Sequence, residues 1–173
     1  MYAGPPKGET AGMDATKEAL LETLDAQRRH VLGSLEGLDA AALRQPALPT
    51  HWNCVGMVQH LALDVERFWF CRTVGGEPFD SPGDSRSAWV VGPSVPPEEI
   101  LTLYREEIDR ANAIIRDTPL EAAPAQWADH FGSWRLPDLR AILLHVIVET
   151  ACHAGHLDAA RELIDGKTWL ILQ

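Results

Sequence analysis

The chain has 173 residues, of which 46% are hydrophobic, enough for one compact domain with a sizeable core. Its formal charge is −10 and its 15 lysines and arginines are scattered, which argues against a nucleic-acid surface and against binding to an anionic membrane. No apolar run approaches the length of a membrane-spanning helix. The three cysteines, Cys54, Cys71 and Cys152, form no CxxC pair, which favours a reducing cytoplasm over a disulfide framework.

The N-terminal half predicts a leader and two helices. Residues 1–13 are rich in glycine and proline and lack a hydrophobic signal core, so we expect a flexible leader to a single domain of residues 14–173. Leucine and valine recur every three or four residues over 14–35, as one face of a helix requires. Asn53 is a good N-cap for a second amphipathic helix over 54–74.

The C-terminal half predicts two more helices and two long loops. Residues 77–95 and 120–137 combine proline with glycine or alanine and several tryptophans, as in loops that line binding sites. Between them, a helix opens at Pro96 and ends before Pro119, and the last helix covers about 137–164. Without any strand pattern, four amphipathic helices predict an all-α helical bundle.

The last helix carries a row of potential metal ligands. His145, Glu149 and His153 follow one another at four-residue intervals and lie on one face, and His156 lies at the edge of the same row. Two ligands at this spacing can bind one ion, but spacing alone does not choose among the four. The alternative is a set of hydrogen-bonded core histidines with Glu149 paired inside the helix. Because this helix is apolar almost all round, an ionised glutamate there favours a bound cation.

A metal site needs a ligand from a second helix, and of the four other histidines three are candidates for roles near it. His60 lies beside the apolar stripe of the second helix and is the best candidate for the third ligand. His51, near the start of that helix, is a candidate for a contact to a ligand. His130 lies in a loop and is a candidate substrate contact. His30 follows two arginines and is expected at the surface.

The cysteines are not expected to supply a nucleophile. Cys152 lies roughly 100° from His153 around the helix, which places it in the core. The other two lie at the ends of the second helix. Trp89 and Trp134, in the two loops, are expected to wall a pocket.

Two stretches resemble the DinB-like superfamily of metal-binding four-helix bundles. Residues 52–70 read WNCVGMVQHLALDVERFWF and are similar to the family's second-helix histidine motif. Residues 133–166 read SWRLPDLRAILLHVIVETACHAGHLDAARELIDG and are similar to its last helix. The closer likeness, over about residues 14–166, is to the actinobacterial branch with mycothiol-dependent enzymes such as maleylpyruvate isomerase. It implies a four-helix bundle with long connecting loops.

The resemblance also implies a ligand set. Many DinB-like proteins use three histidines, whereas this branch combines one second-helix histidine with a glutamate and a histidine four residues apart. The implied metal ligands are therefore His60, Glu149 and His153. His156 falls where many relatives have glutamine, which argues against a primary ligand, and whether His145 or His156 lies in or beside the ligand set stays open. No catalytic residue beyond the metal is implied.

The chemistry follows from the ligand set and the resemblance. Two imidazoles and one carboxylate leave a divalent ion with open positions; zinc is the default, and nickel, iron(II) or manganese are compatible. The resemblance implies a transferase or isomerase in which a low-molecular-weight thiol, such as mycothiol, is deprotonated at the metal and attacks an electrophile. The alternatives are a metal-dependent hydrolase and a metal-binding stress protein without turnover. An exposed helix face would allow a homodimer.

Overall fold

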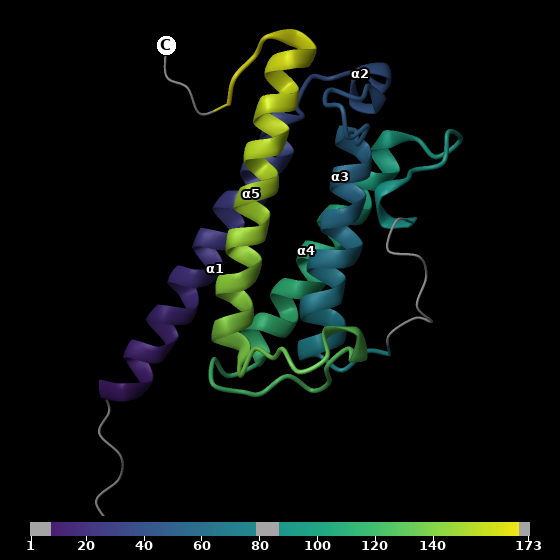
Figure 1. Ribbon diagram of the computed structural model, residues 1–173. Helices are drawn as coiled ribbons and strands as arrows, with labels where there is room; N and C mark the ends of the chain where they lie inside the picture. The colour runs from purple at the N-terminus through teal and green to yellow at the C-terminus, as the bar shows by residue number, and fades with distance from the viewer. Residues whose placement is uncertain (1–7, 79–86, 170–173) are drawn as a thin grey trace, which may run out of the picture.

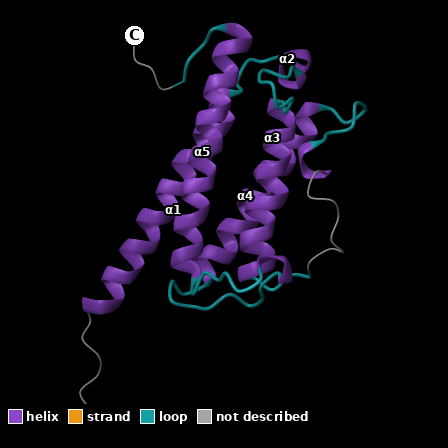
Figure 2. Ribbon diagram, viewed as in Figure 1, coloured by secondary structure: helices purple, strands orange, loops and turns teal. Residues whose placement is uncertain are grey.

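The computed structural model describes residues 8–78 and 87–169 of the chain (Figure 1). In these two ranges all regular structure is helical, and Figure 2 shows helices joined by loops without a strand. The helices are α1 (Gly8–Ser34), α2 (Ala40–Arg44), α3 (Cys54–His60), η1 (Leu61–Val74), η2 (Ser87–Trp89), α4 (Pro97–Asp117), η3 (Asp129–Phe131) and α5 (Leu139–Asp165). The predicted all-α fold is confirmed.

Two pairs of long helices make up the bundle. α1 lies along α5, and α4 packs along η1, which continues α3 as one rod (Figure 1). α5 also contacts η1 and α3, so the last helix faces the rod that carries His60. None of the described helices is both long and apolar enough to cross a membrane.

The core consists of the apolar side chains that recur at helical spacing in the sequence. All four long elements contribute fully buried residues, among them Leu24, Val31, Val58, Val65, Tyr104, Ile115, Val146 and Leu157. Burying such side chains is the main favourable term in folding a domain of this size. These buried residues pack the helices against one another and so fix the positions of the residues that project between them.

Local sequence signals set most helix ends. The side chain of Asn53 accepts a hydrogen bond of 2.9 Å from the Gly56 amide and caps α3, as predicted. α5 ends at Gly166, whose φ of 75° is in the left-handed region that glycine adopts without strain. α1 begins at Gly8, earlier than predicted, and residues 1–7 lie outside the described ranges. The division into a leader of 1–13 and a domain of 14–173 stays a prediction.

The second predicted helix changes its winding after His60. From Leu61 onward it is a π-helix, and at its end the Gly75 amide bonds to the carbonyl of Phe70, five residues earlier, at 2.8 Å. Long π-helices are rare, and short ones are frequent at functional sites. Apolar spacing predicts that this segment is helical but does not distinguish the two windings.

A buried ion pair anchors the π-helix in the bundle. Glu66, fully buried, accepts hydrogen bonds from Arg28 Nε at 2.7 Å and from Arg28 Nη2 at 2.5 Å. Arg28 also donates to Asp25 and to Asn112, both at 2.7 Å, which connects α1, η1 and α4. Burial would lower the pKa of Arg28, but the Glu66 carboxylate raises it above its ordinary value. The arginine therefore stays charged inside the core.

Candidate metal centre

The three ligands implied by the sequence meet between two helices. His60 is the last residue of α3, and Glu149 and His153 lie one turn apart on α5. Each offers a ligand atom, and these atoms lie within 4.8 Å of one another. Among the described residues, no other trio of histidine, cysteine, aspartate or glutamate side chains meets that condition. The geometry suits a metal, while ligation itself stays a prediction.

The imidazole ring of His60 is held by Asp64 at a ring nitrogen and by Trp89 on its face. Its Nδ1 lies 2.9 Å from Asp64 Oδ2, one turn further along the helix. If Nδ1 donates to Asp64, the lone pair of Nε2 is free, and Nε2 lies 3.9 Å from Glu149 Oε1. A carboxylate behind the imidazole is the usual support of a metal-binding histidine. The residues present thus fit a metal at Nε2.

Trp89 stacks on the face of His60, with ring centroids 4.0 Å apart and planes at 20°. Two contacts to α3 hold this tryptophan in place. The Gln59 side chain donates to the Ala88 carbonyl at 2.9 Å, and Gly56 lets the Trp89 carbonyl approach so closely that an added Cβ would lie 2.3 Å from its oxygen. Trp89, which was expected to line a pocket, therefore lies directly against the candidate ligand His60.

Replacing Gly56 with alanine is expected to displace Trp89 and weaken metal binding about tenfold, because His60 loses the ring that orients it. The measurement is a competition titration with a chelating dye. The matched control is Gly155→Ala on α5, where an added Cβ meets nothing within 4 Å. Equal affinity in both variants would exclude this role of Trp89.

Glu149 is ionised and held by a neighbouring histidine. Its Oε2 lies 3.3 Å from His145 Nε2, four residues earlier on α5. Burial raises the pKa of Glu149, but its hydrogen bond to His145 and its electrostatic interactions with the three neighbouring imidazoles bring it below its ordinary value. His145 therefore lies beside the three candidate ligands and contacts one of them.

His153 is neutral, and one of its ring nitrogens is unpaired within the described part of the chain. Burial and the neighbouring His60 lower its pKa to about 4, against the opposing effect of Glu149. Its Nδ1 is buried and has no hydrogen-bond partner among the described residues. Metal binding requires a neutral imidazole, so this histidine is in the required state at neutral pH. His156, with its ring 5.7 Å from that of His153, is exposed and packs against Trp52.

Acidification is expected to destabilise the metal-free protein through His153. Its pKa is about 4 in the folded state and 6.5 ordinarily. As the pH falls, the unfolded chain takes up this proton first, so folded stability decreases from about pH 6.5 towards about pH 4. Urea unfolding near neutral pH and near pH 5 should therefore show a larger loss for the wild type than for His153→Gln. An equal loss in both proteins would contradict this assignment.

The burial predicted from the sequence is wrong for two residues, His30 and Cys152. His30 was expected at the surface, but it is buried between α1 and α5, where its Nε2 lies 2.7 Å from Asp158 Oδ2 and its ring stacks on Trp169. The arginines before it gave a misleading signal, because Arg28 is itself buried. Cys152 was expected in the core, but it is exposed, because α5 packs on only part of its circumference.

His51 and His130 do not join the candidate ligands. His51 is exposed and has a positive φ of 61° just before α3. His130 is exposed and contacts Phe68 and Phe131, with ring centroids 5.9 Å and 4.2 Å away. Its predicted role as a substrate contact stays a prediction.

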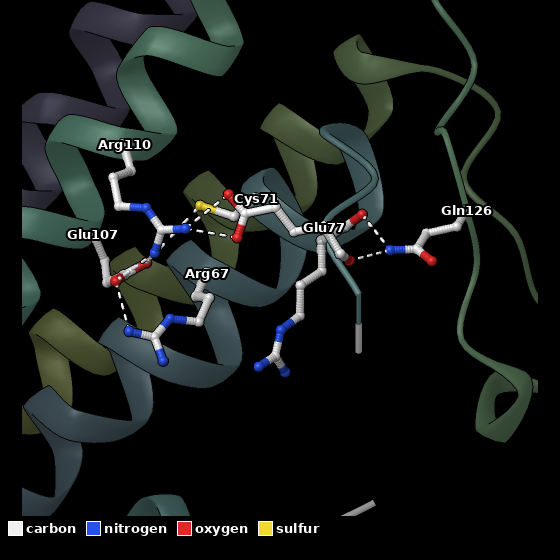
Figure 3. Close-up of polar contacts among 7 residues, drawn as sticks. Arg67, Cys71, Glu77, Glu107, Arg110 and Gln126 are labelled. Atoms are coloured by element: carbon white, nitrogen blue, oxygen red, sulfur yellow. Dashed lines mark hydrogen bonds and ion pairs between the residues drawn. The ribbon is translucent and has the colours of Figure 1, made fainter. Parts of the chain in front are cut away.

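The two buried cysteines are poor nucleophiles. Burial raises the pKa of Cys54 and that of Cys71 to about 11 each. Cys71 Sγ lies 3.9 Å from Glu107, whose carboxylate binds Arg67 and Arg110 (Figure 3). Since the thiolate is the reactive form, neither side chain supplies a nucleophile at neutral pH.

An aromatic cluster lies next to the candidate ligands, on the side of His145. We use this name for Phe68, Trp69, Trp127, Phe131 and Trp134. Trp69 lies at its centre and contacts His145 at a centroid distance of 4.8 Å, and Trp134 contacts the same histidine at 5.7 Å. Most of this cluster comes from the loop between α4 and α5. Trp134, which was also expected to line a pocket, thus contacts His145, and His145 in turn contacts the candidate ligand Glu149.

A comparison with models of protein families shows to which family the chain belongs. The model of the mycothiol-S-transferase family matches residues 19–166. The chain belongs to the mycothiol-S-transferase family. No curated protein and no solved structure matches it. Membership confirms the mycothiol-related branch indicated by the motifs in residues 52–70 and 133–166, and the helical bundle agrees with it.

Proposed function

We propose that this protein transfers a low-molecular-weight thiol, mycothiol, to an electrophile at a divalent metal ion held by His60, Glu149 and His153. The observation that supports it best is the meeting of these three side chains within 4.8 Å in a member of the mycothiol-S-transferase family. A bound metal with three protein ligands keeps open positions and lowers the pKa of a thiol that binds there, so that the thiol reacts as a thiolate.

The residues around the three ligands support this role. Asp64 and Trp89 orient His60, and His145 holds the second oxygen of Glu149. Side chains that are fixed before a ligand arrives lose little freedom on binding it, so the site is preorganised. Because the set mixes nitrogen and oxygen, zinc is the default metal, with nickel, iron(II) or manganese as alternatives.

The charges near the site favour a thiol without carboxylates. The printed sequence has few cations, and the described residues in contact with the three ligands include no lysine or arginine. With a divalent ion and a thiolate bound, Glu149 and Asp64 would leave the site net negative, which disfavours the two carboxylates of glutathione. This argument and the family both favour mycothiol, whose polar groups are mainly hydroxyls.

The proposal is tested with the purified protein by measuring bound metal and thiol conjugation in parallel. We expect about one metal ion per chain and a rate with mycothiol that exceeds the rates with bacillithiol and glutathione by at least about tenfold. Absence of metal would contradict the whole proposal. Bound metal without thiol-dependent turnover would favour a metal-binding protein, and metal-dependent hydrolysis without thiol would favour a hydrolase.

A further inference from the structure

Several exposed apolar side chains belong to the segments that carry the candidate metal centre. Six large apolar side chains are strongly exposed among the described residues, and four of them either follow or precede a residue of this site in the sequence or contact one in space. We call the four the apolar rim; they are Val90, Trp134, Leu144 and Val148. Val90 follows the Trp89 that stacks on His60, Leu144 and Val148 precede His145 and Glu149, and Trp134 contacts His145. Single exposed apolar side chains are common, so the ring contact of Trp134 with His145 is the observation that connects this surface with the site.

Trp134 offers an open aromatic surface beside the reacting position. It is 43% exposed, while its inner side packs on Trp69, Trp127 and Phe131. An indole held in this way is rigid, and a planar ring can stack on its free surface at little entropic cost. His145 connects Trp134 to Glu149, so a ring on this surface would lie next to the candidate ligands.

The electrostatics disfavour a carboxylate-bearing substrate. Glu149 Oε1 lies 3.9 Å from His60 Nε2, and Asp64 Oδ2 lies 2.9 Å from the Nδ1 of the same ring. With a divalent ion and a thiolate bound, these two carboxylates would leave the site with a net negative charge. Arg135 is the cation that contacts the aromatic cluster, over Trp127 at 5.4 Å, and its Nη1 already donates to the carbonyls of Gly132 and Trp134. At the three candidate ligands, an anionic electrophile would therefore meet a net negative charge.

We infer that the electrophile is an uncharged aromatic compound whose ring binds on Trp134 within the apolar rim. This inference rests on the proposed function and names its substrate class. With an alkyl chloride as substrate, the thiol sulfur forms a bond to the carbon that bears chlorine, and the carbon–chlorine bond breaks. Chloride leaves with the electron pair, and the thiol proton passes to solvent. The ring does not react, so its effect is on binding and orientation.

Three chlorides with the same reacting carbon separate the effects of ring and charge: 2-chloro-N-phenylacetamide, 2-chloroacetamide and chloroacetate. Chloride release is measured with mycothiol and the metal-loaded protein, after subtraction of the uncatalysed rate. We expect kcat/KM to be at least about tenfold higher for the phenyl compound than for chloroacetamide, and lowest for chloroacetate. Equal values for the first two, or a preference for chloroacetate, would overturn the inference.

Matched variants test Trp134 itself. Trp134→Ala should lower kcat/KM for the phenyl compound at least about fivefold more than for chloroacetamide. The control is Trp169→Ala, which removes an indole of similar exposure, 45% against 43%, at the other end of α5. The control should keep the wild-type preference. A loss of preference in both variants would contradict a specific role for Trp134.

A binding measurement separates this inference from the proposed function. If no chloride reacts, the proposed function fails, and the inert N-phenylacetamide still tests the rim by shifts of the Trp134 indole N–H signal in NMR spectra. We expect shifts with N-phenylacetamide that acetamide and acetate at equal concentration do not produce. If N-phenylacetamide produces no more shift of this signal than acetamide and acetate do, the inference is wrong. A homodimer that Val148→Asp dissociates, together with no shift, would assign the rim to a second copy of the chain.

Discussion

Replacing His60 with alanine is expected to reduce bound metal from about one ion per chain to background and thiol conjugation by at least about a hundredfold. His60 is the only one of the three candidate ligands that comes from α3, and two residues on one helix cannot enclose an ion. Its loss leaves Glu149 and His153 on α5 with most of the coordination sphere open. Elemental analysis and the conjugation assay, run on the same preparation, measure both effects.

His156→Gln is the matched control for this experiment. His156 lies three residues after His153 with its ring 5.7 Å away, but it is exposed and stands outside the group of ligand atoms. The control should keep its metal and its activity. Retention of metal in His60→Ala, or loss of metal in both variants, would refute the ligand set. If His153→Ala loses its metal and Glu149→Gln keeps it, only Glu149 would be excluded from the ligand set.

Replacing Glu66 with alanine is expected to lower the free energy of unfolding by about 3 kcal/mol. Arg28 and Glu66 are 2% and 0% exposed, and the substitution leaves the guanidinium buried without its main counter-charge. The value lies at the lower end of the range for such losses, because Asp25 and Asn112 keep their bonds to Arg28. Urea unfolding measures the change at an unaltered m-value.

Two further variants isolate the cause. Glu77→Ala breaks the exposed pair with Arg110, whose side chains are 44% and 42% exposed, and should cost less than about 1 kcal/mol. The double variant Arg28→Met with Glu66→Leu removes both buried charges and should recover most of the lost stability, since apolar pairs often replace buried ion pairs without penalty. If the double variant is as unstable as Glu66→Ala, lost packing and not the uncompensated charge explains the effect.

The sequence alone determined the helices, and its motifs identified the side chains at the site. Apolar spacing within a helix is a local property, so the four long helical segments and the Asn53 cap follow from short stretches of chain. The spacing of Glu149 and His153 placed them on one face. His60 was already the best candidate for their partner, the resemblance selected these three together, and the structure brings them within 4.8 Å of one another.

Only the tertiary structure decided which helix faces meet, because burial depends on partners that are distant in sequence. Arg28 is buried where Glu66, from another helix, pairs with it. His30 is buried where Asp158, also from another helix, lies beside its ring nitrogen. Cys152 is exposed although its helix is apolar almost all round, since none of the helices in the described ranges covers that side of α5. The π winding after His60 and the stacking of Trp89 on that ring also depend on long-range packing. A local pattern contains no information on such contacts, which is why these features were absent from the sequence prediction.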